Sequence, residues 1–302
     1  MAEPESFESL RPLLFAIAYR MLASVSDAED VVQDAFLRYQ RALERGSAIE
    51  SLKSYLSALV TRLAIDFLRS ARARRETYVG EWLPEPILTD QDPVSSDSER
   101  AESISMAFLV LLQRLNAVER AVFLLHDVFG HGYAEIAGIV GKSEEHCRQL
   151  ALRARKHIDE GRPRFEPSLA VRDDLARRFF AAVANGDSDA LLQMLAKDAV
   201  VYGDGGGKAP QWPRPISGRD RIAQLLSSVG VRLTDLGGDL ALREVNGQPG
   251  ALVFDRERRL INVFTLDISG GVVQTVRSVI NPDKLRHLGP LADIQALLRQ
   301  RP

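Results

Sequence analysis

Two arginine-rich segments of the 302-residue chain could bind a polyanion. The first follows an apolar run and contributes Arg62, Arg69, Arg72, Arg74 and Arg75. The second lies near the middle of the chain and holds Arg148, Gln149, Arg153 and Lys156. Guanidinium and ammonium groups bind phosphates without reading sequence, whereas arginine and glutamine can also bind base edges bidentately. Both segments therefore suit nucleic acid, although ordinary solvated helix ends would have the same composition.

A third segment, residues 26–39, is acidic and also carries large apolar side chains. If it is helical, the following residues lie within about three turns of one another: Asp27, Asp30, Gln33, Asp34, Phe36 and Leu37. An acidic patch beside exposed apolar side chains suits docking on a basic partner protein. The alternative is a plain amphipathic helix whose acidic start complements the helix dipole.

Groups for acid–base catalysis are sparse in the last part of the chain. Asp204, Tyr202 and Asp267 could serve as acids or bases, but the only histidine after residue 165 is His287. The run DGGGK, residues 204–208, lacks the longer glycine frame and the Ser or Thr of a phosphate-binding loop. Its glycines more simply permit positive φ or close approach of the backbone. The sequence therefore assigns no catalytic residue and predicts no enzyme.

The cysteine content and the hydropathy pattern limit the cellular setting. The single cysteine, Cys147, excludes an intramolecular disulfide and offers no metal cluster, so neither a metal nor a cofactor is predicted. No run approaches the roughly 18–20 apolar residues that span a bilayer. The first ten residues carry acids where a signal peptide would be basic. We therefore expect a cytoplasmic protein that contacts no membrane.

Helices must position the first basic segment and the acidic segment. Apolar residues recur at three- and four-residue spacing over positions 10–21. Ser26 is expected to cap a second helix that Gly46 and Ser47 end, and a third helix is expected from about Leu52. Residues 6–76 are therefore predicted to form an all-helical domain. Residues 77–103 follow as a linker that contains prolines and, unusually for a tether, a tryptophan, Trp82.

Residues 104–161 are predicted to form a helix-turn-helix domain. Asn116 and Glu119 make a capping box, Gly141 supplies a turn, and Ser143 caps the last helix. That helix directs Cys147 and its apolar neighbours inward and leaves its basic residues outward, Arg155 among them. A helix, a glycine turn and a basic second helix are typical of this motif.

Residues 165–290 indicate an α+β domain. Two helices precede a strand at residues 199–203, a further helix lies near 219–229, and four strand-like runs follow. Asn246-Gly247 and Gly270-Gly271 stand where hairpin turns belong. Helices followed by an antiparallel meander are typical of an α+β fold.

The helical segments, in this order, resemble a bacterial RNA polymerase sigma factor of the extracytoplasmic-function type. Residues 27–38 resemble the polymerase-binding helix of sigma region 2, and residues 51–76 resemble the part of that region that melts and reads the −10 element. Residues 117–158 resemble region 4, which binds the −35 element. The resemblance implies a multidomain protein with a region 2 helical bundle, a region 4 helix-turn-helix domain, and core RNA polymerase and promoter DNA as partners.

The same resemblance assigns roles to particular residues. The six residues named in the acidic segment would bind core polymerase. The loop before the third helix, residues 45–51, would read −10 bases, and the arginines of the first basic segment would contact phosphates. Together these residues form the −10 set: Arg45, Ser47, Ser51, Arg62, Arg69, Arg72, Arg74 and Arg75. The −35 set is Ser143, Glu144, His146, Arg148, Gln149, Arg153 and Lys156.

The last segment resembles the SnoaL-like branch of the NTF2 cone fold. Sigma factors with this arrangement form a SigJ-like group that carries a proline-rich linker motif, a DGGGK motif and an NPDK motif, and all three occur here. The resemblance implies an α+β NTF2-like cone that modulates the sigma factor in cis through Trp82, Pro84, Pro86, Asp204, Gly205, Gly206, Gly207, Lys208, Asn281, Pro282, Asp283 and Lys284. Lys208 is expected to pair with Glu81 or Glu85. A small-molecule or protein regulator of the cone stays open, as does the alternative that the cone is a sensor or enzyme coupled to DNA binding.

Overall fold

The computed structural model describes residues 6–76, 78–90, 104–160, 169–212 and 214–299, with the side chains of 71–76, 169 and 298 excepted. These residues divide into two compact units. One unit combines residues up to 77 with 108–162, and the other combines 78–107 with 163–302. The linker thus belongs to the same unit as the C-terminal part of the chain, although it lies between the two helical regions in sequence.

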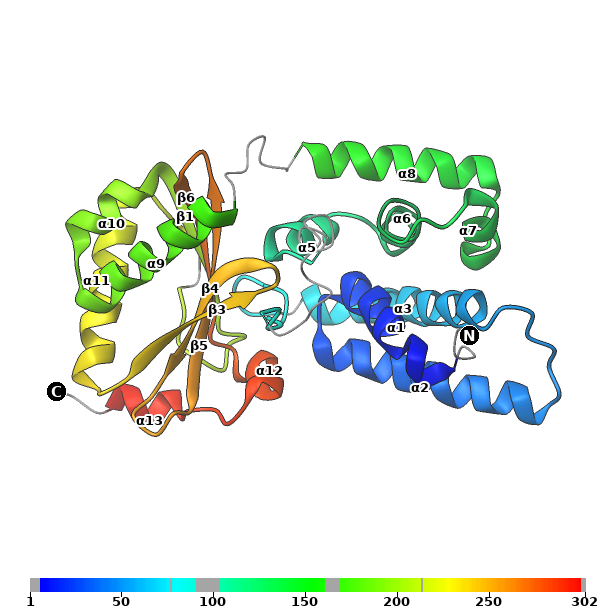
Figure 1. Cartoon of the computed structure of the whole chain (residues 1–302), viewed down its shortest axis with the longest axis horizontal. Helices are drawn as coiled ribbons and strands as arrows, with labels where there is room; N and C mark the ends of the chain where they lie inside the picture. The colour runs from blue at the N-terminus through cyan, green and yellow to red at the C-terminus, as the bar shows by residue number, and fades with distance from the viewer. Residues whose placement is uncertain (1–5, 77, 91–103, 161–168, 213, 300–302) are drawn as a thin grey trace. The chain divides into compact units, whose positions relative to one another are not determined.

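The first unit begins with a bundle of three helices, α1 (Phe7–Leu22), α2 (Val25–Glu44) and α3 (Leu52–Glu76), drawn in blue in Figure 1. A capping box between Ser6 and Ser9 starts α1. Ser24, not Ser26, caps α2, because the Ser24 hydroxyl accepts the Asp27 N–H at 3.1 Å. The prediction of Ser26 was therefore wrong by two residues, since the helix starts as soon as the left-handed Ala23 ends α1.

The remaining helices of this unit form the predicted helix-turn-helix. They are α5 (Met106–Leu112), α6 (Ala117–Phe123) with a π-helical continuation η2 (Leu124–Val128), α7 (Tyr133–Val140) and α8 (Glu144–Asp159). The capping box of Asn116, the left-handed turn at Gly141 and the Ser143 cap are all present. The apolar faces of α6, η2, α7 and α8 meet in one cluster: Val122, Leu125, Ile136, Ile139, Cys147, Leu150 and Ala151.

The second unit contains one six-stranded sheet in the order β2-β1-β6-β5-β4-β3. The strands are β1 (Leu195–Asp204), β2 (Ile216–Ser217), β3 (Asp239–Val245), β4 (Gln248–Phe254), β5 (Leu260–Ser269) and β6 (Val272–Val279). The meander from β3 to β6 is antiparallel, as predicted, whereas β1 runs parallel to β6. Both predicted hairpin turns form, and Asn246, Gly247, Gly270 and Gly271 all have positive φ.

Three helices cover one face of this sheet: α9 (Leu169–Asn185), α10 (Ser188–Met194) and α11 (Arg219–Asp235) (Figure 1). Phe179 and Phe180 of α9 and Leu226 of α11 pack against Phe264 and Val276 of the sheet in one buried core. After β6 the chain forms α12 (Pro282–Leu285), the short 3-10 turn η3 (Arg286–Leu288) and α13 (Ile294–Arg299). This is the predicted α+β cone, and its opposite sheet face carries the polar residues described next.

Candidate regulatory site and nucleic-acid interface

The linker segment 78–90 lies against the C-terminal domain and extends its sheet at one point. Leu88 forms an antiparallel bridge with Val245, at the end of the edge strand β3. The Thr89 N–H donates to the Glu244 carbonyl at 3.0 Å, and the Asn246 N–H donates to the Ile87 carbonyl at 2.9 Å. An edge strand offers unpaired N–H and C=O groups, so an extended segment binds it without rearranging the sheet.

Asp204, the first residue of the DGGGK motif, is the centre of the contact. Its carboxylate has no exposed surface and pairs with the buried Lys284 ammonium at 2.7 Å. It also accepts the Leu83 N–H at 2.8 Å and the Tyr78 hydroxyl at 2.5 Å. Strand β1 ends at Asp204, and the Asp204 carbonyl accepts the N–H groups of residues 280 and 281, which holds the strand end beside the NPDK motif.

Lys284 joins this carboxylate to the linker. Its ammonium donates to the Leu83 carbonyl and lies 4.1 Å from the centre of the Trp82 ring and 5.0 Å from that of Tyr78. Two aromatic faces near a desolvated ammonium stabilise its charge, typically by about 0.5–2 kcal/mol for each cation–π contact. The tryptophan that is unusual for a tether therefore has a specific partner in the NPDK motif.

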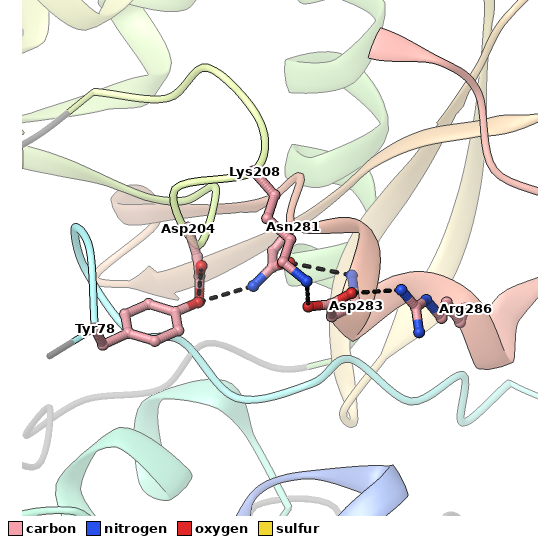
Figure 2. A network of polar contacts seen from close by, with 6 residues as sticks. All are labelled: Tyr78, Asp204, Lys208, Asn281, Asp283 and Arg286. Atoms are coloured by element: carbon pink, nitrogen blue, oxygen red, sulfur yellow. Dashed lines mark hydrogen bonds and ion pairs between the residues drawn. The ribbon is translucent and has the colours of Figure 1, made fainter. Parts of the chain in front are cut away.

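Tyr78 completes the network that Figure 2 shows with Asp204, Asn281 and Asp283. The Asn281 amide donates to the Tyr78 oxygen at 2.9 Å, and the Tyr78 hydroxyl donates to Asp204. Burial raises the pKa of Tyr78, and the hydrogen bond to the Asp204 carboxylate raises it further. The phenol thus stays protonated and can keep donating to Asp204. Tyr78 was not predicted from the sequence, because it resembles an ordinary linker residue next to a basic helix end.

The glycines of DGGGK have a steric role. Gly206 and Gly207 have positive φ, and a Cβ at Gly206 would overlap the Asn281 amide. Lys208 follows and pairs with Asp283 rather than with Glu81 or Glu85, so the predicted pairing was wrong. Lys208 is 56% exposed, so this ion pair contributes little to stability compared with the buried pair of Asp204 and Lys284.

The other regulatory candidates also lie at this contact. Pro84 and Pro86 are buried, and the Pro86 carbonyl lies 2.7 Å from His287 Nε2. Gly205 is buried, and a Cβ there would overlap the Ala209 carbonyl. Pro282 is the first residue of α12, and the Asn281 side chain caps that helix through the Asp283 N–H. The structure thus brings the three sequence motifs together in one unit.

The carboxylates considered for catalysis are already paired. Asp204 binds Lys284, and Asp267 binds Arg277 at 2.5 Å and the Gln248 amide at 2.7 Å. Each of the two carboxylates is therefore held in an ion pair with a buried cation of the same domain. Among the described residues, no group of three or more His, Cys, Asp or Glu side chains is arranged to hold a metal.

In the helix-turn-helix, α8 presents most of the predicted −35 residues at its surface. Gln149, Arg153 and Lys156 are exposed, and Glu144 is half-buried. Arg148 lies over the Tyr133 ring at 5.5 Å and pairs with Glu144. Ser143 and His146 are exposed at the first turn, where the Ser143 hydroxyl caps the helix. Arg155, expected to point outward, instead pairs with Asp127 at 2.7 Å, which raises its pKa.

One exposed apolar residue on α8 was missed by the sequence analysis. Leu152 is 67% exposed and lies one turn from Arg148 and from Lys156. An apolar side chain on the base-reading face of a recognition helix can contact a thymine methyl group. The signal was present in the sequence, since a leucine at an outward position of a basic helix is not needed for packing.

The region 2 candidates are mostly at the surface. Asp30, Gln33 and Leu37 are exposed on α2, while Asp27, Asp34 and Phe36 are half-buried. Arg45, Ser47 and Ser51 are exposed in the loop between α2 and α3, and Arg69 is exposed on α3. The side chains of Arg72, Arg74 and Arg75 lie outside the described residues.

Arg62 of the −10 set has its guanidinium engaged with backbone carbonyls. It donates to the carbonyls of Ile139 at 3.0 Å and Gly138 at 2.8 Å, at the C-terminal end of α7. A cation at a helix C-terminus is favourable because the last carbonyls have no partner within the helix. A phosphate contact by Arg62 would require these two hydrogen bonds to break.

Two family profiles match the helical unit. The profile described as Sigma-70 region 2 matches residues 6–74, and the one described as Sigma-70, region 4 matches residues 105–158. A helical bundle and a helix-turn-helix that match these profiles in this order define a sigma factor. Among the described helices, none is long and apolar enough to cross a membrane.

Similarity over nearly the whole chain narrows this class. The chain is 36% identical to the ECF RNA polymerase sigma factor SigJ of Mycobacterium tuberculosis, over 93% of each chain. It is 32% identical to the probable ECF RNA polymerase sigma factor SigI of the same organism, over 91% of this chain and 92% of SigI. The crystal structure of SigJ superposes with a TM-score of 0.74 at 34% identity and covers 95% of this chain and 99% of its own. The chain belongs to the extracytoplasmic-function family of RNA polymerase sigma factors. Members of this family direct core RNA polymerase to promoters, and this confirms the predicted family and function.

Proposed function

We propose that the C-terminal domain regulates this sigma factor in cis by holding the linker between regions 2 and 4. The observation that carries the proposal is the buried pair of Asp204 and Lys284, which binds Leu83 through both its N–H and its carbonyl. Two ions from the domain thus fix one linker residue. The linker joins the two promoter-binding regions. When the C-terminal domain binds the linker, it therefore limits the range of separations that regions 2 and 4 can adopt.

The residue sets of regions 2 and 4 belong to the same proposal. The exposed acidic and apolar residues of α2 would contact core polymerase, the 45–51 loop and α3 the −10 element, and α8 the −35 element. The exposure of Asp30 and Leu37 on α2, of Arg45 and Ser47 in the loop, and of Arg153 on α8 supports these roles. We propose that the protein works in the cytoplasm, where promoter DNA and core polymerase are found.

We propose further that the C-terminal domain binds and does not catalyse. The pairing of Asp204 with Lys284 and of Asp267 with Arg277 supports this, since each carboxylate is held in place by a buried cation. A small-molecule or protein regulator would then act by changing the hold on the linker. Turnover of a small molecule by the purified chain would contradict this part of the proposal.

Transcription with truncated chains tests the regulation directly. A promoter is first selected from a randomised library by run-off transcription with core polymerase and the full chain. Chains ending near Arg164 and near Val279 are then compared, because the first lacks the whole domain and the second lacks only the NPDK motif and the tail. Lys284→Met is the matched point variant. We expect all three to change transcript yield and core affinity, and wild-type values in all three would refute regulation in cis.

A further inference from the structure

Tyr133, the first residue of α7, contacts both neighbouring elements of the helix-turn-helix. Its ring stacks on that of His126 in η2, with the ring centres 4.0 Å apart and the planes 26° apart. Its hydroxyl accepts from the Arg155 guanidinium of α8 at 3.3 Å. The guanidinium carbon of Arg148, also on α8, lies 5.5 Å from the centre of the ring. One half-buried side chain thus joins the helix before the turn to two arginines of the recognition helix.

The π-helical turn η2 supplies the groups that hold this ring in place. His126 Nδ1 donates to the His131 carbonyl at 3.0 Å, so the imidazole is itself fixed. The next residue, Asp127, pairs with Arg155 at 2.7 Å and fixes the cation that binds the Tyr133 hydroxyl. A π-helical turn is rare and is frequently found at a functional site. This one fixes Tyr133 both at its ring face and at its hydroxyl.

Arg148 is the exposed member of the cluster. Its side chain is 59% exposed, and it pairs with Glu144 one turn earlier in α8. A solvated arginine has many rotamers, and losing them opposes binding to DNA. A guanidinium that is held by a carboxylate and an aromatic ring has lost part of this freedom before DNA binds, which favours the complex.

We infer that Tyr133 is a positioning residue that presents Arg148 to a guanine of the −35 element. The inference rests on the proposed assignment of α8 to that element, and adds the base and the residue that orients its reader. A guanidinium over an aromatic face still donates in its own plane, so N–H groups not bonded to Glu144 can face a base edge. Guanine presents two acceptors, O6 and N7, in the major groove, whereas adenine presents one acceptor and one donor.

The experiment uses the holoenzyme assembled from core polymerase and the full chain. Each position of the −35 element in a promoter selected by run-off transcription is varied over the four bases, and affinities are measured by fluorescence anisotropy. Arg148→Ala should remove a preference for guanine of at least about fivefold, and this identifies the position that Arg148 reads. Tyr133→Leu should lower the same preference by about twofold to fivefold, the usual effect of losing an exposed cation–π contact. Preferences at the other positions should not change.

Three further variants separate positioning from packing. Tyr133→Phe keeps the ring and removes the hydroxyl, so it should retain the preference for guanine. Val140→Ala, at the other end of α7, removes packing from the apolar cluster that Tyr133 also contacts, and is the matched control. It should lower stability and leave all base preferences at the wild-type values. Tyr133→Leu combined with Arg148→Ala should match Arg148→Ala alone at this position, because the ring acts through the arginine.

The outcomes distinguish this inference from the assignment of α8. A preference that Arg148→Ala removes and Tyr133→Leu leaves intact would overturn the role of Tyr133 and keep the −35 assignment. An equal loss of affinity at every position in Tyr133→Leu, or the same loss of preference in Val140→Ala, would reduce Tyr133 to a packing residue and overturn it too. Base preferences that are unchanged in Arg148→Ala would overturn both the reading of guanine and the placement of the recognition helix.

Discussion

Replacing Lys284 with methionine removes one charge from a buried pair and keeps most of the side-chain length. In the native domain the ammonium is 7% exposed and the Asp204 carboxylate is fully buried. Breaking such a pair from one side costs about 3–5 kcal/mol, because the remaining charge is left in a poorly solvated site. Asp204 would still accept from Tyr78 and Leu83, so we expect the lower end, about 3 kcal/mol of unfolding free energy.

Tryptophan fluorescence isolates the relevant unit. The chain has two tryptophans, Trp82 and Trp212, and both belong to the unit that holds the pair. A urea titration followed at the tryptophan emission therefore reports unfolding of that unit alone. Trp82 lies against the Lys284 ammonium, so its emission in the native state should also change in Lys284→Met.

A double-mutant cycle decides whether the pair itself is responsible. Asp204→Asn alone should also lower the unfolding free energy of the domain. The double variant Asp204→Asn/Lys284→Met should lose less unfolding free energy than the sum of the two single variants, by at least about 1 kcal/mol. Lys197→Met, on an exposed position of β1, is the control and should stay within about 0.5 kcal/mol of wild type. A loss below about 1 kcal/mol in Lys284→Met, or strict additivity in the cycle, would refute the reasoning.

Three further predictions concern pH dependence, promoter reading and polymerase docking. Burial and the hydrogen bond to Asp204 raise the pKa of Tyr78 in the folded domain above its ordinary value of 10.0. The stabilisation by this hydroxyl is therefore present below pH 10 and is lost as the pH rises beyond it. The urea midpoint of wild type should therefore fall more steeply above pH 10 than that of Tyr78→Phe, and parallel curves would contradict this. Leu152→Ala should weaken binding by about 1 kcal/mol to −35 sequences that have a thymine facing this residue, and should leave binding to other sequences unchanged. Fluorescence anisotropy with a library of −35 sequences measures these affinities, and an equal loss at every sequence would exclude a methyl contact. Reversing the charges of Asp30 and Asp34 together should weaken core binding at least tenfold with an unchanged circular dichroism spectrum, because both side chains are solvent-accessible on α2, and wild-type affinity would remove this assignment.

Local sequence patterns predicted most of the elements, because each one is determined within a few residues. The capping box at Asn116 and the glycine turn at Gly141 define the helix-turn-helix through near neighbours. The Asn-Gly and Gly-Gly turns define hairpins in the same way, since only the residues in the turn need positive φ. Ser26 was misplaced because Ser24, Ser26 and Asp27 could each cap a helix, and the end of α1 decides which one does.

Contacts between distant segments were beyond this kind of reasoning. The parallel pairing of β1 with β6 joins strands about 75 residues apart, and no periodicity records it. The predicted partners of Lys208 were wrong for a related reason. Lys208 was expected to meet the acidic residues beside Trp82 in the linker, whereas it pairs with Asp283 of the NPDK motif.

Asn246 shows why a correct local prediction can still miss a function. The sequence indicated a turn at Asn246-Gly247, and asparagine tolerates the required positive φ. That explanation is complete for the backbone and says nothing of the side chain. Glycine would serve the turn equally well, so the amide itself points to a contact elsewhere, here with residues 87 and 104.

The C-terminal domain binds the linker through charged and amide side chains as well as apolar ones. Such a contact suits a reversible interaction between the domain and the linker. A buried ion pair adds little net stability over apolar groups of similar volume, because desolvation offsets most of its attraction. When the linker dissociates from the domain, water can solvate Asp204, Lys284 and the Asn246 amide again. The hydration free energy gained in the open state therefore offsets much of the interaction free energy that is lost. A contact made only of apolar side chains would gain no hydration free energy on opening, and each added apolar side chain would make opening more unfavourable. The polar hold therefore keeps the two states within a few kcal/mol, a difference that the binding of core polymerase can overcome.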